Sequence, residues 1–149
     1  MYELNTWYLI PFLVMGVLAY WFWFTYPPPI SGKEFNRRYP EMRFYKFIGK
    51  KTKSGKCDMT NRDYTYKYGR NTVPYFYPYA DCSGRGLYFS DQENIKHYSM
   101  FGYKLFRVKV PDDAIVAEGT DKWKADSVII SELTKTDILC IPWVGKRQK

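Results

Sequence analysis

The sequence is poor in the residues that most often carry catalysis and metal binding. It has one histidine, His97, and three cysteines, Cys57, Cys82 and Cys140, in 149 residues. The cysteines show no C-x-x-C spacing, and three cysteines cannot all pair with one another. This pattern disfavours a zinc site, excludes a full disulfide framework and is typical of a reducing compartment. We expect no metal and no cofactor.

Charge is absent from a long stretch near the N-terminus. Residues 7–26, WYLIPFLVMGVLAYWFWFTY, contain no charged side chain. At about 1.5 Å per helical residue, a stretch of this length spans roughly the 30 Å hydrocarbon core of a bilayer. Tyr2 and Glu3 precede it and three prolines follow it, which is not the pattern of a cleaved signal peptide. The stretch therefore predicts a retained transmembrane helix.

Aromatic residues gather at both ends of this stretch, as they do at the two interfaces of a membrane. They are Trp7 and Tyr8 at one end and Trp21, Trp23 and Tyr26 at the other. Lys33, Arg37 and Arg38 follow directly. Because positive residues flank membrane helices on the cytosolic side, we expect a single-pass protein whose C-terminal part is cytosolic, with these three side chains at the membrane surface.

Positive charge is concentrated in the half of the chain that follows the apolar stretch. Residues 33–70 hold 12 of the 23 lysines and arginines but only 4 of the 15 acidic residues. Such a segment binds either anionic lipid headgroups or nucleic-acid phosphates. The predicted anchor at residues 7–26 holds these charges at a headgroup surface. We therefore expect a lipid bilayer or an acidic protein as the partner of this segment, and nucleic acid is disfavoured.

Hydrophobicity, a run of prolines and charge divide the chain into three parts. These are a tail and membrane helix at 1–26, a proline-rich spacer at 27–32 and a basic, aromatic-rich domain at 33–149. β-prone segments occur at 42–49, 87–89, 103–110, 115–118, 127–133 and 137–141. Ser90 and Glu93 have capping-box spacing and predict a helix over 91–101. The expected fold class is α+β, with one transmembrane helix before a small β-rich mixed domain.

The segment GRGLYFSD begins an ordered series of motifs that continues through VKVP to KWKAD. The matching residues are Gly86, Leu87, Tyr88, Phe89, Val108, Val110, Pro111, Lys122, Lys124, Ala125 and Asp126. This series resembles a cassette of proteins from large eukaryotic DNA viruses and some phages. With the anchor and the basic domain, the chain resembles minor capsid proteins of the chlorovirus type. The resemblance implies a non-enzymatic structural protein of the virion that tethers an inner membrane to the capsid and contacts neighbouring capsid proteins.

The same GRGLYFSD segment also resembles a core strand of ADP-ribosyltransferases. That resemblance implies a degenerate transferase-like fold in which Tyr88 stacks on nicotinamide and Glu132 is the late catalytic glutamate. The family has a histidine in an early strand, whereas the strand at 42–49 has none and His97 lies in a later helix. We therefore expect no enzymatic activity, and a transferase-like enzyme or an NAD-binding pseudoenzyme is the alternative.

The C-terminal tail, IPWVGKRQK, is a candidate docking segment. Trp143 offers an apolar side chain, and Lys146 and Arg147 lie just beyond it. Tryptophan and arginine are favoured at the centres of protein interfaces. These features suit a capsid contact, but a membrane-anchored subunit of a large cellular complex, such as an organellar one, would share them. That subunit is the second alternative.

Overall fold

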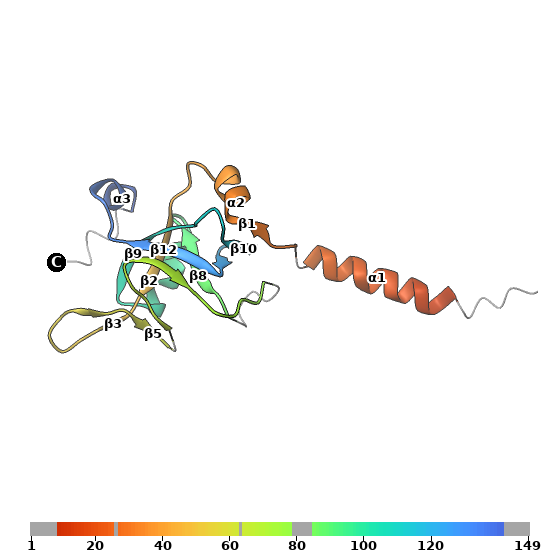
Figure 1. Cartoon of the computed structure of the whole chain (residues 1–149), viewed down its shortest axis with the longest axis horizontal. Helices are drawn as coiled ribbons and strands as arrows, with labels where there is room; N and C mark the ends of the chain where they lie inside the picture. Colours follow the sequence, from red (N-terminus) through yellow and green to blue (C-terminus); the bar gives the residue numbers. More distant parts are fainter. Residues whose placement is uncertain (1–8, 26, 63, 79–84, 142–149) are drawn as a thin grey trace, which may run out of the picture.

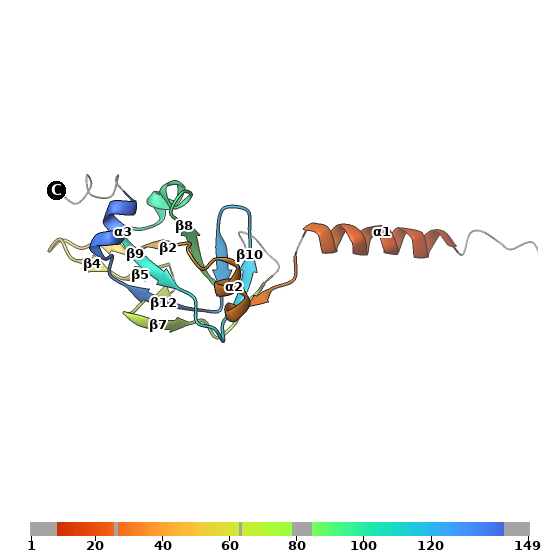
Figure 2. The same cartoon turned by 90° about the horizontal axis from the view of Figure 1, so that it is seen from above.

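The computed structural model describes residues 9–25, 27–62, 64–78 and 85–141. In Figure 1 a straight helix, α1 (Leu9–Thr25), projects from one end of a β-rich domain. Figure 2, seen from above, shows the same separation, with α1 standing clear of the sheet and of the other helices. The molecule is therefore an exposed helix joined to a folded domain.

The predicted transmembrane helix over residues 7–26 is wrong. α1 has 17 residues, and at about 1.5 Å per residue it reaches about 26 Å, short of the roughly 30 Å hydrocarbon core. Within residues 9–25, 27–62, 64–78 and 85–141, no helix combines the length and the hydropathy needed to cross a membrane. The expected fold class with a transmembrane helix is therefore wrong. The expected localisation, a single-pass membrane protein with its C-terminal part on the cytosolic side of an inner membrane, is not supported either.

Eight strands form one antiparallel sheet in the order β1-β10-β11-β8-β2-β9-β12-β7. They are β1 (Ile30–Ser31), β2 (Phe44–Ile48), β7 (Gly69–Thr72), β8 (Leu87–Asp91), β9 (Lys104–Lys109), β10 (Ile115–Glu118), β11 (Trp123–Ala125) and β12 (Ser127–Ser131). Two short hairpins lie outside the sheet: β3 (Lys50–Lys51) with β4 (Cys57–Asp58), and β5 (Thr60–Asn61) with β6 (Tyr64–Thr65). The domain is thus β-rich and built on one antiparallel sheet.

Both faces of the sheet are covered by buried side chains. Successive residues of a strand point to opposite sides, so one strand contributes to both clusters. In β2, Phe44 and Ile48 belong to one core cluster, and Tyr45 and Phe47 belong to the other. The larger cluster contains an aromatic group in which the rings of Phe44 and Trp123 have centroids 5.1 Å apart. Residues on both sides of the central strand β2 are therefore buried.

A short helix after the proline segment closes one side of the larger core cluster. α2 (Gly32–Arg38) begins where the Ser31 hydroxyl accepts the backbone N–H of Glu34 at 3.1 Å. Its Phe35 side chain is fully buried. A Cβ on Gly32 would lie 1.8 Å from the carbonyl oxygen of Pro111, so only glycine fits there. The sequence pattern assigned these residues to a spacer and a basic flank and missed the helix.

The helix predicted over residues 91–101 is a shorter 3-10 helix, η2 (Ile95–Phe101), and its predicted cap is wrong. The Ser90 hydroxyl does not cap it but donates to a backbone carbonyl of the β10–β11 turn at 2.6 Å. Asp91 accepts the backbone N–H of Glu93 instead, at 2.9 Å. Ser90 is the buried penultimate residue of β8, which leaves its side chain unable to reach the following turn.

The strand predicted over residues 137–141 is also wrong, because this segment belongs to a helix, α3 (Lys135–Cys140). Thr134 and Asp137 form a reciprocal capping box: the Thr134 hydroxyl accepts the Asp137 N–H, and the Asp137 carboxylate accepts the Thr134 N–H. A short apolar run does not distinguish strand from helix by its period. The capping box stabilises the start of a helix, and the segment is helical.

Candidate interaction surfaces

The two residues of the transferase alternative are not brought together. Tyr88 lies on β8 and Glu132 directly follows β12, with β2 and β9 between those strands. Leu87 and Phe89 point into the larger core cluster, so Tyr88 points to the other side of the sheet. Glu132 comes two residues after Ile130, a member of that cluster, and so lies on the cluster's side. The two side chains face opposite sides of the sheet.

Each of these side chains has close neighbours of its own. The Lys124 ammonium lies 5.5 Å from the centroid of the Tyr88 ring. Glu132 accepts hydrogen bonds from Lys104, at 2.8 Å, and from the hydroxyl of Tyr68. The hydrogen bond from Lys104 is the main reason that the pKa of Glu132 is lowered. Glu132 is therefore an ionised member of a surface ion pair, without the raised pKa expected of a general acid.

The described residues contain no cluster of side chains that combines His97 with other catalytic groups or that could hold a metal ion. His97 lies exposed in η2, outside the strands of the sheet. In the described part of the chain, no three His, Cys, Asp or Glu side chains are grouped so that they could hold a metal ion. The described residues therefore offer no geometry from which a metal-dependent step can be derived.

The basic flank predicted at a membrane surface is largely neutralised by acidic side chains. Arg37 and Arg38 both bind the Glu34 carboxylate, at 2.7 and 2.8 Å, and Arg38 also binds Glu118 at 2.9 Å. Hydrogen bonds from Arg37 and then Arg38 lower the pKa of Glu34 to about 2. Lys33 is exposed beside them. Three positive charges thus face two negative ones, which leaves little net charge for a membrane surface.

Several predicted surface residues lie outside the described parts of the chain. They are Trp7, Tyr8 and Tyr26 at the expected membrane boundaries and Trp143, Lys146 and Arg147 in the expected docking tail. Trp23 lies within α1. Trp21, also on α1, has a side chain that is 69% exposed.

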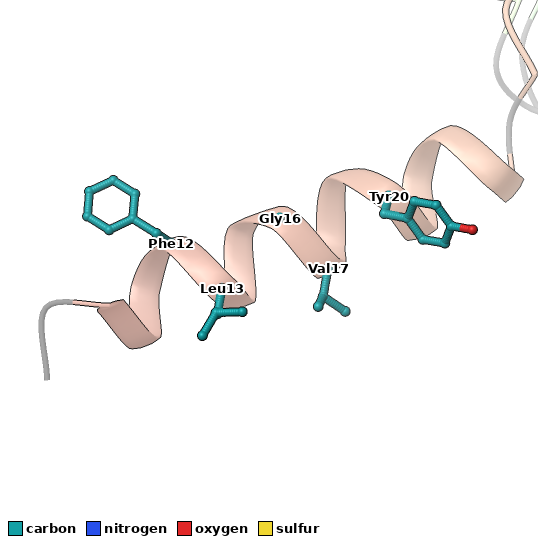
Figure 3. A pocket seen from close by; sticks show the side chains of 5 residues that line it. All are labelled: Phe12, Leu13, Gly16, Val17 and Tyr20. Atoms are coloured by element: carbon teal, nitrogen blue, oxygen red, sulfur yellow. The ribbon is translucent and has the colours of Figure 1, made fainter. Parts of the chain in front are cut away.

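α1 is an exposed apolar surface. Figure 3 shows the side chains of Phe12, Leu13, Val17 and Tyr20 pointing outward from the helix around Gly16. Phe12 and Leu13 are 73% and 68% exposed. A Cβ built on Gly16 would meet nothing within 4 Å, so this position is an open notch between larger side chains. α1 carries no charged residue, and its apolar side chains project on every side.

A second exposed surface is the hairpin of β3 and β4, which we call the lysine hairpin (residues 50–58). Lys50, Lys51, Lys53 and Lys56 are all exposed, and Asp58 is its one acidic residue. Figures 1 and 2 place this hairpin at the end of the domain that is remote from α1. The sequence pattern marked the segment only as a polar loop, although its four lysines within seven residues were the available signal.

A buried ion-pair cluster, missed by the sequence analysis, joins α3 to the sheet. Asp137 is 2% exposed and accepts hydrogen bonds from Arg107 at 2.6 Å, Arg43 at 3.0 Å and the Tyr45 hydroxyl at 3.1 Å. Burial raises the pKa of Asp137, but the hydrogen bonds from Thr134 and the charge of Arg107 outweigh it and lower that pKa to about 2. Every oxygen of this carboxylate is engaged, so the cluster is structural.

A lysine lies between the central strands where β8 leaves β2. The two strands pair only at Phe44 and Tyr45, and beyond that point Lys46 donates from Nζ to the carbonyl oxygen of Tyr88 at 2.6 Å. The ammonium also lies 5.3 Å from the centroid of the Tyr66 ring. Burial lowers the pKa of Lys46 to about 8. Lys46 therefore fills the gap between the diverging strands.

Comparison with known proteins adds no relative to these observations. No family model, no curated protein and no solved structure matches the chain.

Proposed function

We propose that this chain is a non-enzymatic structural protein that joins a larger assembly by inserting α1 into an apolar, uncharged socket on a neighbouring structural protein. The observation that carries the proposal is the exposure of apolar side chains all around α1. Met15, Val17 and Leu18 are 66%, 64% and 60% exposed. Each such side chain contributes about 1.5–3 kcal/mol when it is removed from water, so the helix has a strong drive to be covered.

The distribution of these side chains decides what kind of site fits the helix. A helix that lies in a groove keeps a polar stripe toward water, with apolar residues at positions i, i+3, i+4 and i+7. α1 has no such stripe, because the successive residues Phe12, Leu13, Val14 and Met15 are all apolar and all exposed. A socket that encloses the helix covers all of these side chains, and Gly16 provides a notch for a protruding side chain of the partner.

Charge favours a different protein over a second copy of this chain. The chain has a formal net charge of +8 at pH 7. Bringing several such chains together at α1 would bring their basic domains close, and like charge opposes that association. A neighbouring structural protein with an apolar socket carries no such penalty.

The kind of assembly that the chain joins is proposed from the sequence. The series of motifs from GRGLYFSD to KWKAD supports a viral shell as the assembly, with the chain as a minor component that contacts capsid proteins. A large cellular complex is the alternative, since α1 suits either. Against the transferase alternative stands the placement of Tyr88 and Glu132 on opposite sides of the sheet, since catalysis on one substrate needs both in one cleft.

The test is co-sedimentation with the assembly from cells that make the chain. We expect the unmodified chain to sediment with large particles and the double variant Leu13→Lys, Val17→Lys to stay at the top of the gradient. The matched control adds the same charge to exposed apolar residues of the domain, as Met42→Lys, Leu139→Lys, and should sediment normally. Thermal melts of the three proteins should show the same folded domain.

A photocrosslinker in place of Val17 identifies what covers the helix. We expect one covalent product, with a single neighbouring structural protein. Crosslinks confined to a second copy of this chain or to lipid would overturn the proposal, and so would normal sedimentation of the α1 variant.

A further inference from the structure

The lysine hairpin concentrates charge at the end of the domain opposite α1. Its nine residues hold four exposed lysines and one aspartate. None of the four lysines forms an ion pair among the contacts of the described residues, in contrast to Arg37 and Arg38 on α2. The hairpin therefore presents free positive charge, while the flank predicted to be basic does not.

The hairpin has a fixed shape. At its tip, the Thr52 N–H donates to the carbonyl oxygen of Lys56 at 2.9 Å, and the Gly55 N–H donates to the carbonyl oxygen of Thr52 at 3.0 Å. At its base, the side chain of Asn61 accepts the Gly49 N–H at 2.6 Å. Gly49 has a φ of +79°, and a Cβ there would lie 1.9 Å from the carbonyl oxygen of Asp58. The backbone positions of the charges are set before any ligand arrives.

An exposed aromatic ring lies at the base of the hairpin. The Tyr103 N–H donates to the carbonyl oxygen of Gly49 at 2.9 Å, which joins the start of β9 to the hairpin. The Tyr103 side chain is 46% exposed, and the Lys51 ammonium lies 5.9 Å from the centroid of its ring. Phe101, two residues earlier, is 57% exposed. Positive charge therefore lies over a partly exposed aromatic ring.

We propose that the lysine hairpin and Tyr103 form a binding site for single-stranded nucleic acid. The lysines, on long flexible side chains, contact phosphates of the bound strand, and a base stacks on the Tyr103 ring, as in proteins that bind single strands without reading their sequence. The sequence analysis disfavoured nucleic acid because an anchor was expected to hold the basic segment at lipid headgroups. The structure removes that reason, since it shows no such anchor in the described residues and puts the free charge at the far end of the domain from α1.

The chemistry of the site favours a nucleic acid over an acidic protein. Lysines are point charges on flexible stems and lack the planar fork with which arginine clamps individual carboxylates. Four of them on one hairpin suit a regular polyanion, in which the spacing of charges varies little. A base can stack on the exposed ring of Tyr103, whereas a carboxylate forms no such stacking interaction.

The experiment measures fluorescence anisotropy of a labelled 20-nucleotide oligo(dT) with the full-length chain at several salt concentrations. Four phosphate contacts predict that log K falls against log salt with a slope of about −3. Changing Lys50, Lys51, Lys53 and Lys56 together to Gln should abolish binding. The control changes Lys67, Lys96, Lys109 and Lys135 to Gln, which removes the same charge from exposed positions elsewhere, and should bind within about twofold of the unmodified chain.

Substitution of the ring separates stacking from charge. Tyr103→Ala should weaken oligo(dT) binding about fivefold or more, and Tyr103→Phe should retain it. Tyr75→Ala, at another exposed tyrosine, should have no effect. Equal losses in the two lysine variants, or no loss in Tyr103→Ala, would overturn the site.

Competition identifies the class of ligand. Oligo(dT) should displace the probe at a lower charge concentration than polyglutamate, vesicles of anionic phospholipid or duplex DNA. Better displacement by any of the other three would refute the assignment to a single strand. The proposed site does not include α1. The double variant Leu13→Lys, Val17→Lys should therefore bind oligo(dT) at least as well as the unmodified chain.

Discussion

α1 and the domain distribute polar and apolar groups in opposite ways. α1 holds apolar side chains in the open, with Phe12 at 73% exposure, whereas the domain encloses charged ones, with Asp137 at 2% and Lys124 at 3%. At Asp137, hydrogen bonds and ion pairs with Arg43 and Arg107 offset the cost of burying charge. α1 has no comparable compensation for its exposure to water. This difference is the basis of our proposal that another molecule covers α1.

Two phenylalanines give the largest test of this contrast. Phe35 is fully buried among aromatic rings, with Phe44 at 4.9 Å between centroids, and Phe12 is exposed on α1. We expect Phe35→Ala to lower the free energy of unfolding by about 3–5 kcal/mol, because it leaves a cavity. Phe12→Ala should change it by no more than about 0.5 kcal/mol. Urea unfolding of the full chain measures both, and a comparable loss in Phe12→Ala would show that α1 packs on the domain.

Asp137 tests whether charge inside the domain is compensated. We expect Asp137→Asn to lower the free energy of unfolding by about 2–3 kcal/mol at pH 7, because Arg43 and Arg107 lose their shared carboxylate. The unmodified chain should lose this contribution as pH falls from about 4 to about 2, because the folded pKa of Asp137 is about 2 and the unfolded value is about 3.9. Urea unfolding at pH 7, 4 and 3 provides the measurement. A variant that keeps the full acid dependence would contradict this assignment.

Lys46 gives the smallest expected effect, and its effect on stability falls in the alkaline range instead of the acid range. Its folded pKa is about 8 because burial disfavours the charged form, and the unfolded value is about 10.4. Between those values the unfolded chain binds more protons, so the free energy of unfolding should rise with pH, by about 1–3 kcal/mol. Lys46→Met should flatten this rise. Chemical unfolding at pH 7.5, 9 and 10 compares the two proteins, and parallel profiles would show that Lys46 stays charged in the fold.

Local pattern predicted the central strands well. β2 and β9 form inside the segments expected to be strands, and β8 covers the expected residues 87–89 and continues to Asp91. Alternating side chains and bounding turn residues are local signals. The same kind of signal failed at η2 and α3. Ser90 has capping-box spacing but a buried hydroxyl, and the run at 137–141 is too short for its period to separate helix from strand.

The candidate sites were harder to predict because they depend on partners far apart in the chain. Arg38 is neutralised in part by Glu118, 80 residues away, and the Asp137 cluster joins side chains from three segments. The resemblance to a transferase motif paired Tyr88 with Glu132 by order along the chain. Order does not specify which side of a sheet a residue faces, and the strand pairing puts them on opposite sides.

The sequence by itself determined where apolar and positive residues are concentrated: an uncharged segment that forms α1, and a lysine-rich segment near residue 50. Composition and local propensity need no distant contact to act, which is why both features were visible without a structure. Only the tertiary structure decided which charges remain available, since an ion pair requires two side chains within about 4 Å. It pairs Arg38, Arg43 and Arg107 with carboxylates from distant segments and leaves the lysine hairpin exposed, at the opposite end of the molecule from α1.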